Sequence, residues 1–287
     1  MKITFYGVRG SIAVSGRDFV KYGGNTSCVH VELDCGRHLV FDAGTGLQNL
    51  GKKIRKTNDS IYLLLSHHHL DHIQGFPFFD PIYSSSADIH LLMPVVSEGE
   101  VFPLLGQMGG RTFPVPYQNL ASRITTYPLL ECSDYDFLHS TRLSTLSLNH
   151  PGSGLAYKLE ADGATVAYVT DNELFPPGTP LNHYDQWVKF LHGVDVLIHD
   201  AQYTDDDMPH KHGWGHSTIK QVMQLAKDAE VKNLALFHHD QERTDYQLDA
   251  IGKECSEQMQ QNNKETRCFC TFEGMALKLD KNGLNSL

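Results

Sequence analysis

Four histidines and an aspartate lie within six residues, directly after a short apolar run. The run is Ile61–Leu65, and the cluster that follows reads Ser66-His67-His68-His69-Leu70-Asp71-His72. A short apolar run of this kind predicts a buried strand, and the loop after a strand is where a rigid scaffold presents reactive groups. The chain must therefore fold around a sheet that holds this cluster at a strand end.

The spacing inside the cluster favours metal binding. His67 and His69 are two residues apart, so their side chains point the same way in extended backbone. Asp71 and His72 follow where the chain turns, which aims them at a neighbouring point. Imidazole and carboxylate together suit Zn²⁺, Mn²⁺ or Fe, and this many donors exceed the needs of one structural ion. The alternative is an exposed histidine-rich loop without an ordered metal.

Other apolar runs rich in β-forming residues stand between turn signals and predict strands. In the first half these runs are Ile3–Tyr6, Ser27–Leu33, His38–Phe41 and Ile89–Met93. In the second half they are residues 143–148, Leu155–Leu159, Val166–Thr170, Val196–His199 and Leu234–Phe237. Phe272 and Ala276–Leu279 predict a final hairpin around Glu273-Gly274.

Helical patterns are fewer. Apolar residues recur every three or four positions over 219–226, and Ser217 can serve as the N-cap. Thr244 and Gln247 form a capping box before a second helix. Weaker helical patterns cover residues 46–56 and 183–192. Strands in two batches, each followed by helices, predict an α/β protein of two packed sheets with helices outside.

The domain organisation is expected to be simple. We predict one domain over residues 1–287, with an inserted loop or lid at about 94–127. That stretch is the least regular part of the chain, and its turn-forming residues are Pro103, Gly109, Gly110, Pro114 and Pro116.

Composition narrows the class of protein. The six cysteines include no CxxC pair, so we expect reduced thiols in a cytoplasmic protein. The start of the chain lacks a signal-peptide pattern, and no apolar run is long enough to cross a membrane. The net charge of −10 disfavours an extended nucleic-acid surface, which usually needs a basic footprint.

The H-x-H-x-D-H pattern of residues 67–72 resembles the signature of the metallo-β-lactamase superfamily. The resemblance implies an αβ/βα sandwich of two mixed β-sheets flanked by helices, with a dinuclear site at one edge. It also implies further ligands in a set order after later strands. His150, Asp171 and His238 stand in that order, each at the end of a predicted strand.

By this resemblance two metal ions are expected. The first takes His67, His69 and His150, the second takes Asp71, His72 and His238, and Asp171 bridges them. His68 and His239 are adjacent duplicates outside the family pattern, although an exchange of His238 for His239 stays open. The ions are expected to be Zn²⁺, with Mn²⁺ or Fe as alternatives.

Two later segments resemble the phosphodiesterase branch of the superfamily, which includes ribonuclease Z and cyclic-nucleotide phosphodiesterases. They are His199-Asp200-Ala201 and Gly215-His216-Ser217-Thr218. In that branch the histidine points at the scissile phosphate and a carboxylate orients it, roles that the resemblance assigns to His216 and Asp200. Asp200 stands where ribonuclease Z usually has Glu. The alternative for residues 215–218 is a plain helix start.

The N-terminal motifs resemble a bacterial subgroup of this branch. They are Tyr6-Gly7-Val8-Arg9-Gly10-Ser11, Tyr22-Gly23-Gly24-Asn25-Thr26-Ser27-Cys28 and Phe41-Asp42-Ala43-Gly44-Thr45-Gly46. The resemblance covers about residues 2–280. We expect Asp42 to support the ligand loop from behind.

The sequence thus predicts a binuclear metal-dependent hydrolase of phosphodiester bonds, with Asp71, His216 and Asp200 as catalytic residues. The expected substrate is a small phosphodiester, specifically a cyclic nucleotide. The alternatives are a ribonuclease Z-like RNA 3′-processing endonuclease, a thioester or lactam hydrolase, and a non-catalytic ligand sensor on the same fold. The branch also implies a homodimer, and no membrane partner is expected.

Overall fold

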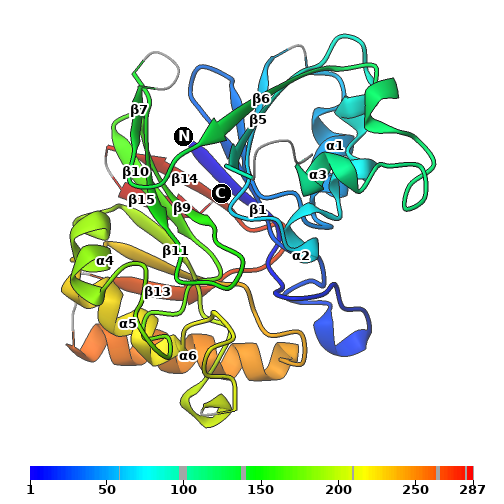
Figure 1. Cartoon of the computed structure of the whole chain (residues 1–287). Coiled ribbons are helices and arrows are strands. Elements are labelled where there is room, and N and C mark those ends of the chain that lie inside the picture. Colours follow the sequence, from blue (N-terminus) through cyan, green and yellow to red (C-terminus); the bar gives the residue numbers. More distant parts are fainter. Residues whose placement is uncertain are drawn as a thin grey trace.

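Two β-sheets pack face to face in the computed structural model of this chain (Figure 1). The structure describes all residues except 58, 97–101, 137–139, 209, 263–265, 282 and 287. Across these residues, helices cover the outer face of each sheet, which confirms the predicted αβ/βα sandwich.

The first sheet has eight strands in the described chain, in the order β15-β14-β1-β2-β3-β4-β5-β6. Strands β3 to β6 run parallel to one another. The bounds are β1 (Lys2–Gly7), β2 (Cys28–Glu32), β3 (His38–Phe41), β4 (Ile61–Leu64), β5 (Asp88–Pro94), β6 (Arg123–Leu129), β14 (Ala276–Asp280) and β15 (Gly283–Ser286).

The second sheet has seven described strands in the order β13-β12-β11-β10-β9-β8-β7. Strands β10 to β13 are parallel. The bounds are β7 (Asp134–Asp136), β8 (Arg142–Ser147), β9 (Leu155–Ala161), β10 (Ala164–Val169), β11 (Val196–Asp200), β12 (Asn233–Phe237) and β13 (Arg267–Cys270).

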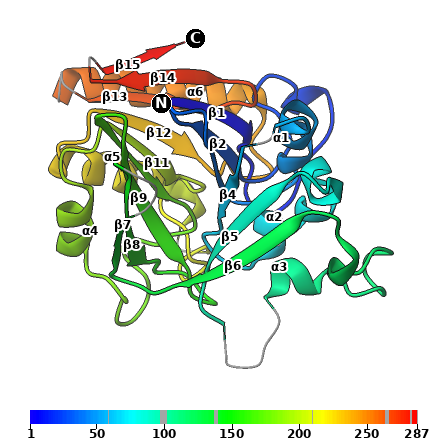
Figure 2. The same cartoon turned by 90° about the horizontal axis from the view of Figure 1, so that it is seen from above.

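Three apolar layers hold the sandwich together. One lies between the sheets and includes Phe5, Phe41, Tyr168 and Phe237. A second lies under α4 (Tyr184–Leu191), α5 (Ile219–Asp228) and α6 (Asp245–Asn262), and a third under α1 (Leu47–Ile54), α2 (Leu70–Ile73) and α3 (Pro103–Gly106). Figure 2 shows the two helix sets on opposite sides of the paired sheets. Short 3₁₀ turns are η1 (Arg17–Phe19), η2 (Phe76–Phe78), η3 (Asp80–Tyr83), η4 (Tyr117–Asn119) and η5 (Asp205–Asp207).

The structure corrects two expectations about strands. The expected hairpin around Glu273-Gly274 does not form, because β13 pairs with β12 in the second sheet whereas β14 pairs with β1 in the first. The connection therefore crosses between sheets, and the terminal hairpin is β14–β15. Strand β6, which pairs with β5, was not predicted either. Most of it lies in the stretch 94–127, which the sequence predicted to be an irregular insertion.

The stretch expected as a lid is only partly described, because residues 97–101 lie outside the described residues. Of the remainder, Leu104 and Met108 are fully buried beside the first sheet. The role of this stretch as a lid, and the single-domain division over 1–287, stay predictions.

The four predicted helices form as α1, α4, α5 and α6, whereas the short helices α2 and α3 were not predicted. The predicted N-cap of α5 is wrong. Thr218, rather than Ser217, is the N-cap, and its hydroxyl accepts a hydrogen bond from the Gln221 amide at 3.3 Å. Ser217 is drawn away because its hydroxyl donates to the carbonyl oxygen of Asn172 at 2.5 Å. No helix among the described residues is long and apolar enough to cross a membrane.

Candidate metal centre

The predicted ligands meet at one edge of the sandwich, where strands from both sheets end. Residues 67–72 follow β4 in the first sheet. His150, Asp171 and His238 follow β8, β10 and β12 in the second. Because parallel strands end at a common edge, residues more than 150 positions apart in the chain become neighbours.

Three residues at these strand ends share an unusual backbone conformation. Asp42, Asp171 and His238 have positive φ values of 61°, 51° and 57°. Side-chain-bearing residues adopt this left-handed region rarely, although Asp, Asn and His tolerate it best. The conformation turns the chain sharply out of each strand, so that the side chain at the turn faces the strand ends.

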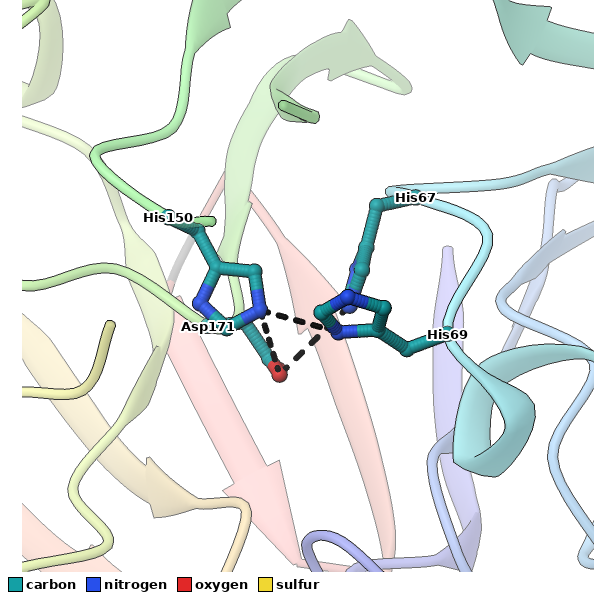
Figure 3. A group of neighbouring side chains, drawn as sticks. All are labelled: His67, His69, His150 and Asp171. Atoms are coloured by element: carbon teal, nitrogen blue, oxygen red, sulfur yellow. Dashed lines mark hydrogen bonds and ion pairs between the residues drawn. The ribbon is translucent and has the colours of Figure 1, made fainter. Parts of the chain in front are cut away.

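The first ligand group combines His67, His69, His150 and Asp171, whose donor atoms all lie within 4.8 Å of one another. Figure 3 shows these four side chains converging on one point, with His67 and His69 on one loop and His150 and Asp171 on two others. His150 Nε2 lies 3.0 Å from His69 Nδ1 and 3.7 Å from Asp171 Oδ2. His67 Nε2 lies 3.6 Å from the same Asp171 oxygen.

The second ligand group combines Asp71, His72, Asp171 and His238, also within 4.8 Å. His72 Nε2 lies 3.2 Å from Asp71 Oδ2 and 3.2 Å from Asp171 Oδ1. His238 Nε2 lies 3.3 Å and 3.1 Å from the same two oxygens. The two oxygens of Asp171 therefore face different groups, which is the geometry of a bridging carboxylate.

Hydrogen bonds to the outward nitrogens orient the rings of His67 and His150, so that their Nε2 atoms face the centre. Nδ1 of His67 contacts Ser66 Oγ at 3.0 Å, and Nδ1 of His150 contacts the Gly215 carbonyl oxygen at 2.9 Å. His67 Nε2 and His72 Nε2 are buried without a hydrogen-bond partner in the described chain. Buried polar atoms of this kind are costly unless a ligand satisfies them, so both groups fit divalent ions.

Asp42 holds the second group from behind, as the sequence predicted. Its carboxylate accepts hydrogen bonds from the Ser66 amide at 2.7 Å and the Ser66 hydroxyl at 2.8 Å. It also accepts from His72 Nδ1 and from the Tyr168 hydroxyl, each at 2.7 Å. These bonds fix the tautomer of His72 and turn its Nε2 toward Asp171.

His216 and Asp200 lie beside both groups. His216 Nδ1 is 3.1 Å from Asp200 Oδ2. The His216 ring centroid lies 5.3 Å from that of His150 and 5.2 Å from that of His238. Asp200 is itself fixed, because it accepts hydrogen bonds from the amides of Asn172 and Gln202 at 3.2 Å and 3.0 Å. The shorter Asp side chain therefore still reaches the histidine.

Burial and charge set the protonation states of these groups. Burial holds the pKa of His67 well below its usual range and lowers the pKa of His150 to about 4. Both rings are then neutral and able to bind a metal. Burial also opposes a charge on His216, but Asp200 outweighs it and raises the pKa of His216 to about 9.

Besides Asp42, other residues that the sequence did not single out brace the second group. The Ser11 amide donates to Asp71 Oδ2 at 2.8 Å, and His238 Nδ1 contacts Gln202 Oε1 at 3.0 Å. Gly10 lies so close that a Cβ there would be 2.5 Å from His238 Nδ1. Gly10 and Ser11 stand in a motif that the sequence did show, but only the folded chain brings them to Asp71 and His238.

The two adjacent duplicates lie outside the ligand groups. His239 Nε2 bonds to the Thr271 carbonyl oxygen at 2.9 Å, and burial lowers the pKa of His239 to about 3. The ring of His68 lies beside Phe102, with ring centroids 6.1 Å apart. The structure thus brings His238 rather than His239 to the centre, while the ligand assignment itself stays a prediction.

Comparison with known families agrees with this architecture. The model of the β-lactamase superfamily domain matches residues 37–239, more than half of the chain. The chain belongs to this superfamily. It is a metal-dependent hydrolase with the metallo-β-lactamase fold, as the sequence predicted.

Several relatives of this superfamily member carry the name ribonuclease Z. The one from Picrophilus torridus is 25% identical over 86% of this chain and 88% of its own length. The one from Halalkalibacterium halodurans is 47% identical over only 51 residues, and the match spans 18% of this chain and 16% of that protein.

Solved structures of low identity share the fold. The short form of human tRNase Z superposes with a TM-score of 0.68 at 19% identity, covering 97% of this chain and 99% of that one. A diphosphatase from the PhnP family superposes with a TM-score of 0.66 at 16% identity, covering 97% and 98%.

Proposed function

We propose that this chain hydrolyses a small phosphodiester, specifically a cyclic nucleotide, with two divalent metal ions. The observation that carries the proposal is the His216–Asp200 pair, which lies beside His150 of one ligand group and His238 of the other. A polar pair at that position would add a proton donor to a two-metal centre, which assists departure of the leaving oxygen of a phosphate ester.

The ligand assignment follows from the two groups. One ion would be held by His67, His69 and His150. The other ion would be held by Asp71, His72 and His238, and Asp171 would bind both ions. When bound, such ions polarise a phosphoryl oxygen and activate water near neutral pH. Their imidazole and carboxylate donors favour Zn²⁺, with Mn²⁺ or Fe as alternatives.

The residues of the chain position the reaction. Asp71 would orient the attacking water as well as bind an ion. His216 would donate a proton to the departing oxygen, and Asp200 holds its ring in place through Nδ1. A positioned general acid typically contributes about 10²–10⁴-fold to the rate.

The charge of the molecule favours a small substrate over a long RNA. The net charge is −10, and the stretch 97–127 contains only two cations, Arg111 and Arg123. Arg123 already pairs with Asp88 at 2.7 Å. A polyanion gains most of its affinity from cationic contacts, so this surface offers little attraction to tRNA.

A substrate panel combined with metal analysis tests the proposal. The purified protein should contain about two divalent ions per chain. It should hydrolyse 3′,5′-cyclic nucleotides and bis(p-nitrophenyl) phosphate faster than a pre-tRNA. Thioester and lactam substrates serve as negative controls. A protein with both ions bound that cleaves no phosphodiester would overturn the proposal in favour of the ligand sensor.

Substitutions of His216 and Asp71 distinguish a role in catalysis from a role in metal binding. His216→Ala should keep its metal content and lose about 10²–10⁴-fold in kcat on its best phosphodiester. Asp71→Ala should instead lose occupancy of the second ion. Full activity of His216→Ala, or full metal content of Asp71→Ala in elemental analysis, contradicts the respective role.

The second candidate function is RNA 3′ processing. It is favoured by the relatives named ribonuclease Z, one of which matches over most of its length. If the protein cleaves the pre-tRNA in the panel faster than the cyclic nucleotides, RNA 3′ processing is the function.

The oligomeric state and location are proposals as well. The branch implies a homodimer, which light scattering on the purified protein tests directly. The six cysteines are free thiols in the structure, which supports a reducing compartment such as the cytoplasm.

A further inference from the structure

A small cavity adjoins the first ligand group. It has a volume of about 220 Å³, and His150, itself a proposed ligand, forms part of its lining. Pockets that bury a whole drug-sized ligand usually measure about 300–1,000 Å³. This cavity therefore suits one portion of a substrate. Glu173, Gly213 and Gly215 also line it.

Glu173 fixes one wall of the cavity to the metal centre. Its side chain is 2% exposed, and its carboxylate accepts hydrogen bonds from the amides of Gly213 and Gly215, each at 2.9 Å. Both glycines have positive φ values, 88° and 89°. The Gly215 carbonyl oxygen in turn bonds to His150 Nδ1 at 2.9 Å. The segment between the glycines is thus held at a set position beside a proposed ligand.

Trp214 lies between these glycines, and its side chain is exposed. It remains 57% accessible, whereas Trp187, the other tryptophan of the chain, is fully buried. The ammonium group of Lys211 lies 4.4 Å from the centroid of the Trp214 ring system and 5.5 Å from that of Tyr203. The Tyr203 ring meets His216 edge-on, with centroids 5.4 Å apart. Successive contacts therefore lead from the proposed acid to the exposed indole.

The charge of Lys211 points to the kind of group that binds here. No carboxylate of the described residues lies within ion-pair distance of its ammonium group. A free cation over one face of an indole holds the ring by a cation–π contact and attracts an anionic ligand. The flat ring suits a planar, aromatic group, which stacks on indole without needing hydrogen bonds to it.

We infer that Trp214 is a stacking platform for the nucleobase of the substrate, with Lys211 bracing its ring. The inference rests on the proposed hydrolysis of a cyclic nucleotide and adds the residue that binds the base of that substrate. Trp214 contacts the substrate away from the scissile bond, so it determines specificity and takes no part in proton transfer.

The test compares two substrates that differ only in the base. Trp214→Ala should lower kcat/KM for a 3′,5′-cyclic purine nucleotide about 5- to 100-fold. The same variant should change kcat/KM by less than about twofold on the corresponding abasic cyclic phosphate, because no base is present to stack. Trp214→Phe keeps an aromatic face and should retain most of the activity on the nucleotide.

Matched controls make the outcome specific. Tyr246→Ala removes another exposed aromatic side chain, on α6, and should leave both substrates unaffected. Lys211→Met keeps the aliphatic stem of the side chain and should lower kcat/KM more for the nucleotide than for the abasic substrate. An equal loss on both substrates in Trp214→Ala, or no loss on either, overturns the inference.

Fluorescence separates failure of this inference from failure of the proposed function. Since Trp187 is buried, quenching by added purine nucleoside monophosphate reports on Trp214. Quenching in the wild type that disappears in Trp214→Phe supports the platform, even in a protein that turns over no cyclic nucleotide. If the wild type shows no quenching at saturating nucleotide, the platform is refuted, whichever phosphodiester the protein cleaves.

Discussion

The carboxylate of Asp42 accepts four hydrogen bonds, and one of them comes from the proposed ligand His72. The acceptor is ionic and fully buried, so each bond is stronger than a neutral one. The histidine can turn only by breaking a bond that nothing else would replace. Asp42 would thereby act on an ion held by His72 without binding it.

Replacement of this carboxylate tests that role. Asp42→Asn keeps the shape but loses the charge, and its amide nitrogen cannot accept a hydrogen bond. Metal affinity should fall about 10–100-fold, as for other groups that orient ligand histidines. Competition with a chelator of known affinity measures the change. Asp88→Asn, which alters a carboxylate paired with Arg123 instead, is the control. Equal affinities of the two variants would contradict the role of Asp42.

At this scale the sequence predicted the proposed ligands and the support from Asp42, but not the supports from Ser11 and Gln202. Each ligand ends an apolar run, which is a local signal. The hydrogen bond between Ser11 and Gln202 joins residues 191 positions apart, and nothing in the sequence around either residue indicates the other. Only the meeting of the sheet ends brings them together.

At the scale of elements, strands with a clear apolar run were predicted well. Strand β6 reads Arg-Ile-Thr-Thr-Tyr-Pro-Leu, and only its last residue is buried. An edge strand of this composition has no apolar run to show. The separation of β13 from β14 was also invisible, because the turn residues Glu273-Gly274 look the same whether the next strand pairs locally or in the other sheet.

The start of α5 gives a prediction about stability. Thr218→Ala removes the side chain that caps the Gln221 amide, so the free energy of unfolding should fall by about 1 kcal/mol. Thr218→Ser keeps a hydroxyl and should lose much less. Urea unfolding followed by circular dichroism measures both. Equal stability of Thr218→Ala and the wild type would show that the cap contributes nothing.

Across the whole molecule, the metal centre joins the two sheets. His67 and His72 follow a strand of the first sheet, whereas His150 and His238 follow strands of the second. Ions bound here therefore cross-link the sandwich as well as serve the reaction.

Chelation should accordingly destabilise the fold. An ion at about 1,000 times its dissociation constant stabilises the native state by about 4 kcal/mol, so its removal should lower Tm by on the order of 10 °C. Calorimetry with and without chelator measures the shift. Asp171→Ala, which lacks the bridging carboxylate, should show a much smaller shift. An equal Tm of the wild type with and without chelator would contradict this prediction.

A buried histidine far from the centre makes stability depend on pH. His30 on β2 is 5% exposed and faces His38 on β3, with ring nitrogens 3.0 Å apart. Burial, aided by the charges of His38, Lys2 and Lys53, lowers the pKa of His30 to about 3. The unfolded state, with a pKa near 6.5, then binds the proton more readily than the native state.

Acid should therefore destabilise the native state. The contribution of neutral His30 to the free energy of unfolding is fully present above about pH 6.5. It is lost as the pH falls toward 3, by at most about 1.4 kcal/mol per pH unit. His30→Gln should flatten the pH dependence of the unfolding free energy of the metal-free protein. His192→Gln, at an exposed histidine, should not. Parallel curves for His30→Gln and the wild type would rule out this contribution.

The left-handed turns at Asp42, Asp171 and His238 carry a consequence for substitutions at these positions. Backbone strain of this kind costs about 1–3 kcal/mol at each position, and glycine would relieve it. Glycine at Asp171 or His238 would remove a proposed ligand, and glycine at Asp42 would leave four buried donors without their acceptor. Substitutions chosen to raise thermal stability should therefore leave these three positions unchanged, although each has a strained backbone.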